Sequence, residues 1–204
     1  MKKGLIVIIV IAVVALGIFM WVKGTYNGLV TKQEGVESAW SQVENVYQRR
    51  ADLVPNLVAT VKGYAAHEKE TLEGVVSARA KATQMTVDPT KLDEASLKKF
   101  QEAQGELGNA IGRLLMITEN YPELKANENF LQLQAQLEGT ENRITVERQK
   151  FNETAKAYNT EVRKFPANII AGMFHFEKYR MYEVDDASER QNVVVDFGNA
   201  GQAQ

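Results

Sequence analysis

The sequence has no cysteine and only two histidines among its 204 residues. The absence of cysteine excludes disulfide bonds, thiol catalysis and the zinc or iron–sulfur sites that need thiolate ligands. The histidines lie more than a hundred positions apart and outside any HExxH spacing, so we expect no metal site. Phosphate-binding loops, dinucleotide-binding turns and GxSxG elbows are also missing. The sequence therefore predicts no catalytic residue and no cofactor.

An excess of charge of one sign is absent as well. The chain has 24 Lys and Arg residues against 26 Asp and Glu residues. Proteins that bind nucleic acid by neutralising phosphates normally carry a basic excess, so we expect no nucleic-acid partner. Proline is scarce, with four residues, and the hydrophobic content of 45% suffices for a core. The length fits one domain with an anchor or a tail attached.

One long hydrophobic run is present, from Leu5 to Val22, and it contains no charged or polar side chain. As a helix it spans about 27 Å, close to the hydrocarbon thickness of a bilayer. Trp21 and Lys23 at its end suit the membrane interface. A cleaved signal peptide is the alternative, but the run is long and FMWVKG lacks small residues for cleavage. We predict a single-pass transmembrane anchor over residues 1–24.

The basic residues near the N-terminus predict the orientation of this anchor. Lys2 and Lys3 cluster before the hydrophobic run, whereas Lys23 and Lys32 beyond it are more widely spaced. Lys and Arg favour the cytoplasmic side of a membrane. We therefore expect the main domain to face outward, into the periplasm or the extracellular space.

Three stretches after the anchor repeat apolar residues at alternating spacings of three and four, at 36–64, 97–121 and 137–165. This pattern is typical of long helices that pack at a shallow angle. It predicts an all-α domain over residues 25–166, an antiparallel up-and-down bundle of the four-helix-bundle type. The remaining tail, 167–204, is expected to dock on the bundle or to pair as a β-strand.

Two prolines predict features of these helices. Pro55 lies inside the first stretch, where we expect a kink or a break because the carbonyl of Ala51 loses its hydrogen-bond partner. Asp88 followed by Pro89 predicts the start of the second helix, as a cap and a first helical residue.

Gly105, Gly108 and Gly112 lie on nearly one face of the second predicted helix. Each glycine in a helix interior costs about 0.5–1 kcal/mol relative to alanine. Close approach of another helix is the expected compensation, and a flexible hinge is the alternative.

Several polar residues on or beside the repeats are candidates for structural or interaction roles. They are Arg49, Arg50, Asp52, Pro55, Asn56, Glu141 and Arg148. Arg50, Glu141 and Arg148 fall on the apolar repeats themselves, and a charge inside a bundle must be paired. We predict an inter-helix ion pair or network that fixes the helix register. The alternative is a polar site that binds an anion or a partner.

Three long segments resemble the LemA family. They read YNGLVTKQEGVESAWSQVENVYQRRADLVPNLVATVKGYAAHEKETLEGVVSARA at 26–80, ENYPELKANENFLQLQAQLEGTENRITVERQKFNETAKAYN at 119–159, and YNTEVRKFPANIIAGMFHFEKYRMYEV followed by VVVDFG in the tail. The resemblance implies a bacterial inner-membrane protein with an antiparallel helical bundle, which associates with other envelope membrane proteins. In magnetosome-forming relatives it also implies a role in membrane organisation. It brings no catalytic residues.

These observations favour a non-catalytic scaffold or assembly protein. A ligand-binding sensor is an alternative and predicts a cavity of several hundred Å³ in the bundle. An enzyme with an unrecognised site between helices is the other alternative. The β-prone run 193–197 has no second strand to pair with, which predicts that the tail joins neighbouring copies into a homo-oligomer. In the alternative, the tail folds back on its own bundle.

Overall fold

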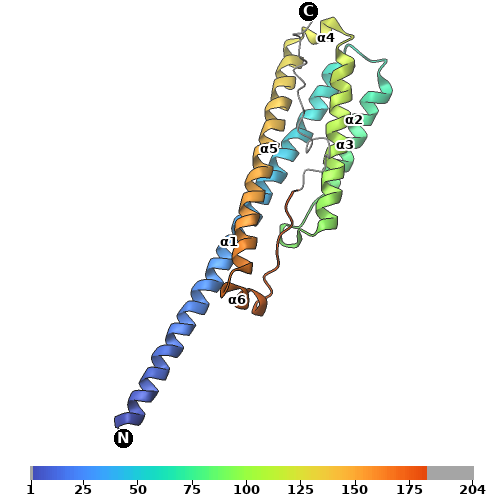
Figure 1. The fold of residues 1–204 in the computed structure, drawn as a ribbon. Coiled ribbons are helices and arrows are strands. Elements are labelled where there is room, and N and C mark those ends of the chain that lie inside the picture. The colour runs from blue at the N-terminus through green and yellow to red at the C-terminus, as the bar shows by residue number, and fades with distance from the viewer. Residues whose placement is uncertain (1, 183–204) are drawn as a thin grey trace, which may run out of the picture.

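The computed structural model describes residues 2–182, and within them the only regular secondary structure is helical (Figure 1). The elements are α1 (Lys2–Lys62), α2 (Lys69–Gln84), the 3-10 helix η1 (Pro89–Lys91), α3 (Glu94–Thr118), α4 (Pro122–Lys125), α5 (Glu128–Arg163) and α6 (Ala167–Met173). The long helices α1, α2, α3 and α5 run alternately up and down and form the bundle. The predicted all-α antiparallel bundle is confirmed.

Helix α1 joins the hydrophobic run to the bundle without interruption. It is 61 residues long, and its N-terminal part projects beyond the other helices (Figure 1). In this part the described side chains from Leu5 to Trp21 are exposed. Among the described residues, α1 is the one helix long and apolar enough to cross a membrane.

The helix also continues through Pro55. The break considered for this position is therefore wrong. The carbonyl oxygen of Ala51, which a proline four residues later leaves without its helical donor, accepts a hydrogen bond of 2.8 Å from Nε of Arg79 on α2. A side chain from a neighbouring helix thus replaces the missing backbone N–H.

The repeat of apolar residues at spacings of three and four did not locate α2, whose buried face consists of small and aliphatic residues: Leu72, Val75, Ala78 and Ala82.

The start of the next helix also differs from the prediction. Asp88 caps the short η1, whereas α3 begins six residues later with Asp93 as its cap, whose carboxylate accepts from the backbone N–H of Ser96. Two successive caps occur in this connection, and the second one starts the long helix.

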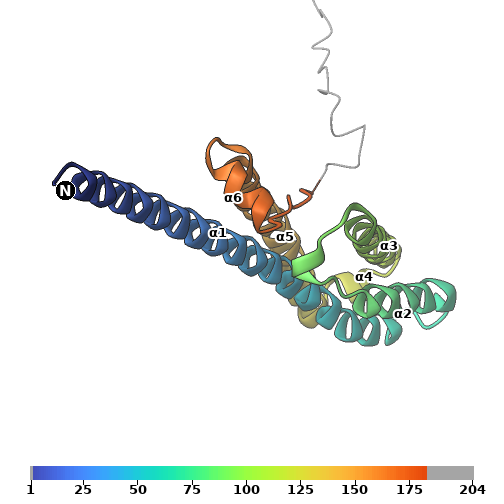
Figure 2. The ribbon, with the colours of Figure 1, turned by 90° about the horizontal axis from the view of Figure 1, so that it is seen from below.

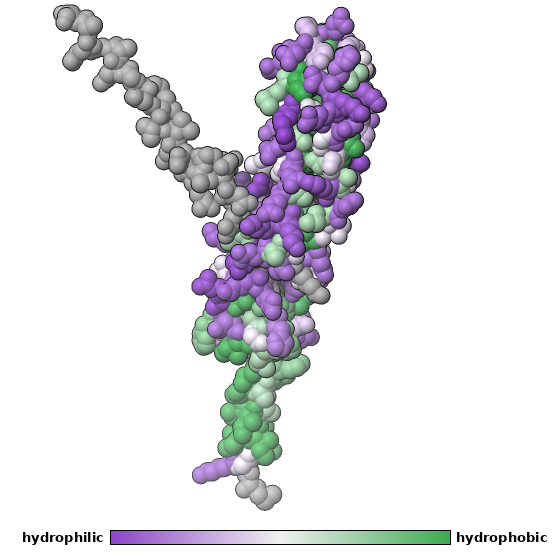
Figure 3. Space-filling view, turned by 90° about the vertical axis from the view of Figure 1, so that its right-hand side faces the viewer, coloured by the Kyte–Doolittle hydropathy of each residue, from purple (hydrophilic) through white to green (hydrophobic). Residues whose placement is uncertain are grey.

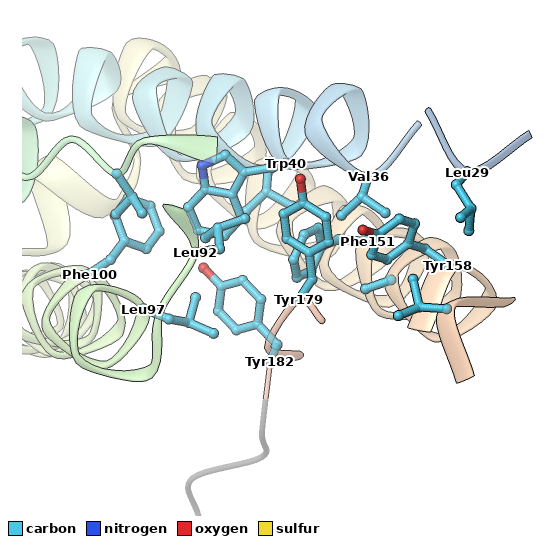
Figure 4. Packing of buried hydrophobic residues seen from close by; sticks show 14 of the residues in the cluster. Leu29, Val36, Trp40, Leu92, Leu97, Phe100, Phe151, Tyr158, Tyr179 and Tyr182 are labelled. Carbon is cyan, nitrogen blue, oxygen red and sulfur yellow. The ribbon is translucent and has the colours of Figure 1, made fainter. Parts of the chain in front are cut away.

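The core divides into two hydrophobic clusters along the bundle. The cluster nearer the projecting end of α1 is aromatic, and Trp40 is its centre (Figure 4). The Trp40 ring lies 5.3 Å from Phe100 of α3, 5.4 Å from Phe151 of α5 and 5.9 Å from Tyr182, measured between ring centres. The other cluster joins aliphatic and small residues of α1, α2 and α3 with Leu124, Phe130 and Leu137.

After α5 the chain turns at the base of the bundle and comes back along it. Seen from below, α2 and α3 lie side by side, with α5 and α6 at the other side of the bundle (Figure 2). Helix α6 ends at Met173, and His175, two residues later, has a φ of 57°. The N–H of Phe176 donates to the carbonyl of Ala171, and that of His175 donates to the carbonyl of Gly172, as in a Schellman motif. This turn directs residues 174–182, here named the strap, back onto the bundle.

Candidate functional site

A groove with a volume of about 710 Å³ lies between α3 and α5, with α1 beneath it. Its lining is mixed. Tyr47 and Arg50 come from α1, and Tyr182 of the strap lies at one end. Most of the remaining lining consists of glutamine, glutamate and glycine residues of α3 and α5.

The three glycines of α3 line this groove rather than a helix contact. A methyl group added at Gly105 or Gly112 would meet nothing within 4 Å, and one at Gly108 would lie 3.4 Å from a terminal nitrogen of Arg50. The prediction that another helix packs against this face is therefore wrong for the described residues. The glycines widen the groove and expose the backbone of α3.

Arg50 is buried beneath the groove, with 4% of its surface exposed. One terminal nitrogen donates to the carboxylate of Glu141 on α5 at 3.0 Å. The other donates to the backbone carbonyl of Gln104 on α3 at 2.7 Å and to its side-chain oxygen at 3.0 Å. The side-chain nitrogen of Gln104 in turn donates to the carbonyl of Ala82 on α2. One arginine thus links α1 with α3 and α5, and through Gln104 with α2.

This polar layer separates the two hydrophobic clusters on three helices. On α1 the aromatic cluster reaches Tyr47 and the aliphatic one begins at Ala51. On α3 and α5, Gln104 and Glu141 lie in the corresponding gaps. A polar group that has partners at only one level disfavours sliding of the helices, and this is the role in helix register that the sequence predicts for the ion pair.

The other candidate residues do not join this layer. Arg49, Asp52, Pro55 and Asn56 lie on the exposed side of α1. Asp52 accepts a hydrogen bond from Gln48 and lies 4.0 Å from a terminal nitrogen of Arg79. The carbonyl of Asn56 accepts from the Thr60 hydroxyl.

Arg148 takes part in a different interaction, with the strap. Its guanidinium carbon lies 4.6 Å from the centre of the Tyr182 ring, a cation–π geometry. The Trp40 ring also stacks on the ring of Tyr182. Arg148 therefore helps to hold Tyr182 at the end of the groove, and it lies apart from the Arg50–Glu141 pair.

Two asparagines of α5 hold the strap by its backbone. Asn159 accepts from the N–H of Tyr179 and donates to its carbonyl, at 2.9 and 2.8 Å. Asn152 does the same with Tyr182, at 2.7 and 3.0 Å. Seven helical residues rise about 10.5 Å, and three extended residues cover about 10 Å, so the two spacings match. The side chains of α5 thus pair with an extended segment as a strand would.

The LemA family model matches residues 39–197. This chain belongs to the LemA family. The match includes most of the bundle part of α1, all the other helices and the strap. Every residue of the polar layer and both asparagines of α5 that hold the strap therefore lie inside the family's domain.

Magnetosome proteins are among the relatives of this LemA-family chain. Magnetosome protein MamQ 2 of Paramagnetospirillum magneticum is 29% identical over 203 residues, which cover 91% of this chain and 74% of the relative. Magnetosome protein MamQ of Magnetospirillum gryphiswaldense is 29% identical over 181 residues, 80% of this chain and 66% of the relative. Protein LemA of Metamycoplasma hominis is 27% identical over 187 residues, 90% and 80% of the two chains. With the apolar helix, the family indicates a membrane-associated helical protein.

Burial raises the pKa of the tyrosines on and beneath the strap. Tyr182 is buried among Trp40, Tyr47 and Arg148, and its pKa lies well above the usual value. The pKa of Tyr179 is raised by burial and by the hydrogen bond of 3.0 Å that its hydroxyl donates to Glu37. Burial and the charge of Glu37 raise the pKa of Tyr158 to about 12. All three hydroxyls stay protonated at neutral pH.

Sequence reasoning missed the residues that organise the strap and support Pro55. Asn152 and Asn159 are seven apart, and Tyr179 and Tyr182 are three apart, so a comparison of helix and strand rises was the available signal. Nothing local to Arg79 marks it as the donor to a distant carbonyl.

Within residues 2–182 no group of three His, Asp or Glu side chains is arranged to hold a metal ion. The run 193–197 lies outside the described residues.

Proposed function

We propose that this LemA-family chain is a non-catalytic, membrane-anchored scaffold or assembly protein that acts through protein–protein contacts in the bacterial envelope. The observation that carries the proposal is the continuity of α1. One helix holds both the exposed apolar run and the central face of the bundle. Such a helix presents the bundle, and the groove on it, at a fixed place relative to the membrane.

In this proposal residues 1–24 are the anchor, 25–166 the bundle and 167–204 the tail. The anchor crosses the inner membrane once, and the bundle faces the periplasm or the cell exterior. Protease added outside intact spheroplasts should then digest the bundle. Full protection of the bundle would place it in the cytoplasm.

The names of the relatives support a role in assembly, because MamQ proteins are magnetosome proteins and their names describe no reaction. The polar, glycine-rich groove supports the same role, since its amide and carboxylate side chains can form hydrogen bonds with a segment of another protein. Self-association through the tail is part of the proposal. A full-length protein that is monomeric in mild detergent would contradict that part.

A photocrosslinking side chain tests the scaffold role in native membranes. It is placed at Asn109, which lines the groove, and for comparison at Ser77, on the exposed side of α2. The expected result is a discrete set of envelope-protein adducts from position 109 that is absent from position 77. Adducts of equal number and yield from the two positions, or none from either, would contradict a scaffold that works through the groove.

The volume of the groove favours a ligand-binding sensor as the second candidate, because ligand pockets usually measure about 300–1,000 Å³. A small-molecule ligand should raise the thermal unfolding temperature of the full chain. The rise should disappear in Gly112→Trp, which fills the groove from an exposed position of α3. A ligand effect that persists in this variant would place the ligand elsewhere.

A further inference from the structure

Five large apolar side chains are exposed together at the base of the bundle. They form a surface that we name the basal patch: Tyr26, Phe165, Ile169, Met173 and Phe174, which are 36, 81, 51, 66 and 49% exposed. The patch joins one turn of α1 to α6 and the turns on either side of it. Exposed aromatic and aliphatic residues gathered in this way mark a surface that contacts a partner or a membrane.

The basal patch lies at the level where the apolar run of α1 ends. A shallow pocket at this place is lined by Trp21, Gly24 and Thr25 from α1 and by Phe165 and Pro166 from the turn before α6. Figure 3 shows the same relation, since the hydrophobic colour of the projecting helix continues onto the base of the bundle and gives way to hydrophilic colour above. The patch is thus continuous with the predicted membrane-spanning surface.

Helix α6 has the two-sided pattern that an interfacial segment needs. Ala167, Ile170 and Ala171 are buried against the bundle, whereas Ile169 and Met173 point away from it. The tip of α6 is fixed to α1 by aromatic contacts, because Tyr26 lies 4.8 Å from Phe174, measured between ring centres. The bundle therefore holds the outward face of α6 in place and does not cover it.

The charges around the basal patch also suit a membrane surface. Lys23 and Lys164 are exposed beside it, and the side-chain nitrogen of Lys164 also lies 3.6 Å from a carboxylate oxygen of Glu161. Basic side chains next to an apolar surface favour the anionic head groups of phospholipids. Aromatic side chains favour the same interfacial region.

We propose that α6 and its flanking turns form a second membrane contact, in which the basal patch inserts into the interfacial layer of the phospholipid bilayer beside the anchor. This inference rests on the proposed transmembrane anchor. With two contacts, the bundle is held by the bilayer at its base as well as through α1. The bilayer then sets both the direction in which the groove faces and the height of the bundle.

Nitroxide labels on single cysteines test the proposal in proteoliposomes of the full chain, which has no cysteine of its own. The test positions are Ile169→Cys and Met173→Cys. The matched control is Val146→Cys on α5, because Val146 is 48% exposed and Ile169 is 51% exposed. Val13→Cys, inside the apolar run, reports on the anchor. Each label is scored by its accessibility to oxygen, which is concentrated in lipid, relative to a water-soluble nickel chelate.

The ratio of oxygen to nickel accessibility should be several-fold higher at 169 and 173 than at 146, and higher still at 13. A ratio at 169 and 173 equal to that at 146 overturns the basal contact while leaving the anchor intact, provided that position 13 reports lipid. A water-like ratio at 13 would instead overturn the anchor. Spin–spin broadening between copies at 169 would assign the patch to a second copy of the chain and also overturn the lipid contact.

Discussion

At the scale of single residues, the two partners of Arg50 contribute unequally to the stability of the bundle. The side chain of Glu141 is 58% exposed, so solvent screens much of its attraction to the guanidinium. Gln104 is buried, and its two oxygens accept from Arg50 in the interior. The hydrogen bonds to Gln104 therefore contribute more to stability than the ion pair does.

Arg50→Ala should destabilise the bundle by about 2–3 kcal/mol, because it leaves the buried side-chain oxygen of Gln104 without its donor and removes the hydrogen bond to the Gln104 carbonyl. Glu141→Gln should cost less than about 1 kcal/mol, since a screened pair is lost. Urea unfolding of the full chain in detergent, followed by circular dichroism, measures both. Arg49→Ala, at the exposed neighbour, should stay within about 0.5 kcal/mol. Equal losses for Arg49→Ala and Arg50→Ala would contradict the polar layer.

Gly105→Ala and Gly112→Ala should each stabilise the chain by about 0.5–1 kcal/mol, because alanine is the better helix former and the added methyl groups meet open space. Gly108→Ala should gain less, since its methyl group would press on Arg50. Thermal unfolding in detergent provides the measurement. Destabilisation by Gly112→Ala would show that something packs against this face in solution.

At the scale of elements, the strap is an extended segment that is held by side chains rather than by another strand. Its two tyrosine side chains enter the aromatic core, and the backbone groups of these two residues form hydrogen bonds with Asn159 and Asn152. Backbone groups that lose such partners favour exposure to water. The attachment of the strap therefore depends on these two amides together with the aromatic contacts.

The double variant Asn152→Ala/Asn159→Ala should release the strap from α5. Cleavage within residues 176–182 by added protease should become faster, with the helical content of the bundle retained. The matched control is Asn142→Ala, at an exposed position of the same helix. Equal cleavage rates in the double variant and the control would mean that the tyrosines alone hold the strap.

Alkaline pH should release the strap as well. Folding raises the pKa of Tyr158 to about 12 and that of Tyr179 and Tyr182 further, so the folded protein binds these protons more tightly than the unfolded chain. The stabilisation is complete below the ordinary tyrosine pKa of about 10 and is lost as pH rises through the folded-state values. Proteolysis of the strap against pH measures the loss. Tyr179→Phe, which cannot ionise, should move the release to higher pH; an unchanged midpoint would contradict this cause.

The sequence allowed prediction of those helices whose buried side chains are large and regularly spaced. Val36, Val43 and Val54 of α1 are fully buried, as their spacing indicates. Helix α2 was not located because alanines supply half of its buried face. The role of the glycines was predicted wrongly because the penalty of glycine in a helix is the same whether the face meets another helix or a groove. The partner of the Ala51 carbonyl comes from a helix 28 residues away, which no local pattern indicates.

At the scale of the whole molecule, α1 makes the orientation of the bundle depend on that of the proposed transmembrane span. A continuous helix from residue 13 to residue 48 measures about 52 Å at 1.5 Å per residue. Nitroxides at Val13→Cys and Gln48→Cys should therefore give one narrow distance distribution near this value in proteoliposomes. Gly24→Pro, in the same helix between the labels, should broaden it because proline disrupts the helix. A broad distance distribution in the chain that retains Gly24 would show that α1 bends flexibly near this residue.

A continuous helix also converts a small tilt at one end into a large displacement at the other. The part of α1 from Val22 to Lys62 is about 60 Å long, so a tilt of the proposed span by about 10° displaces the far end of the bundle by about 10 Å. Spans tilt when their apolar length exceeds the thickness of the hydrocarbon layer. The same chain in a thinner bilayer would therefore present its groove at a different height and angle, and local membrane thickness becomes a quantity that a partner of the bundle can sense.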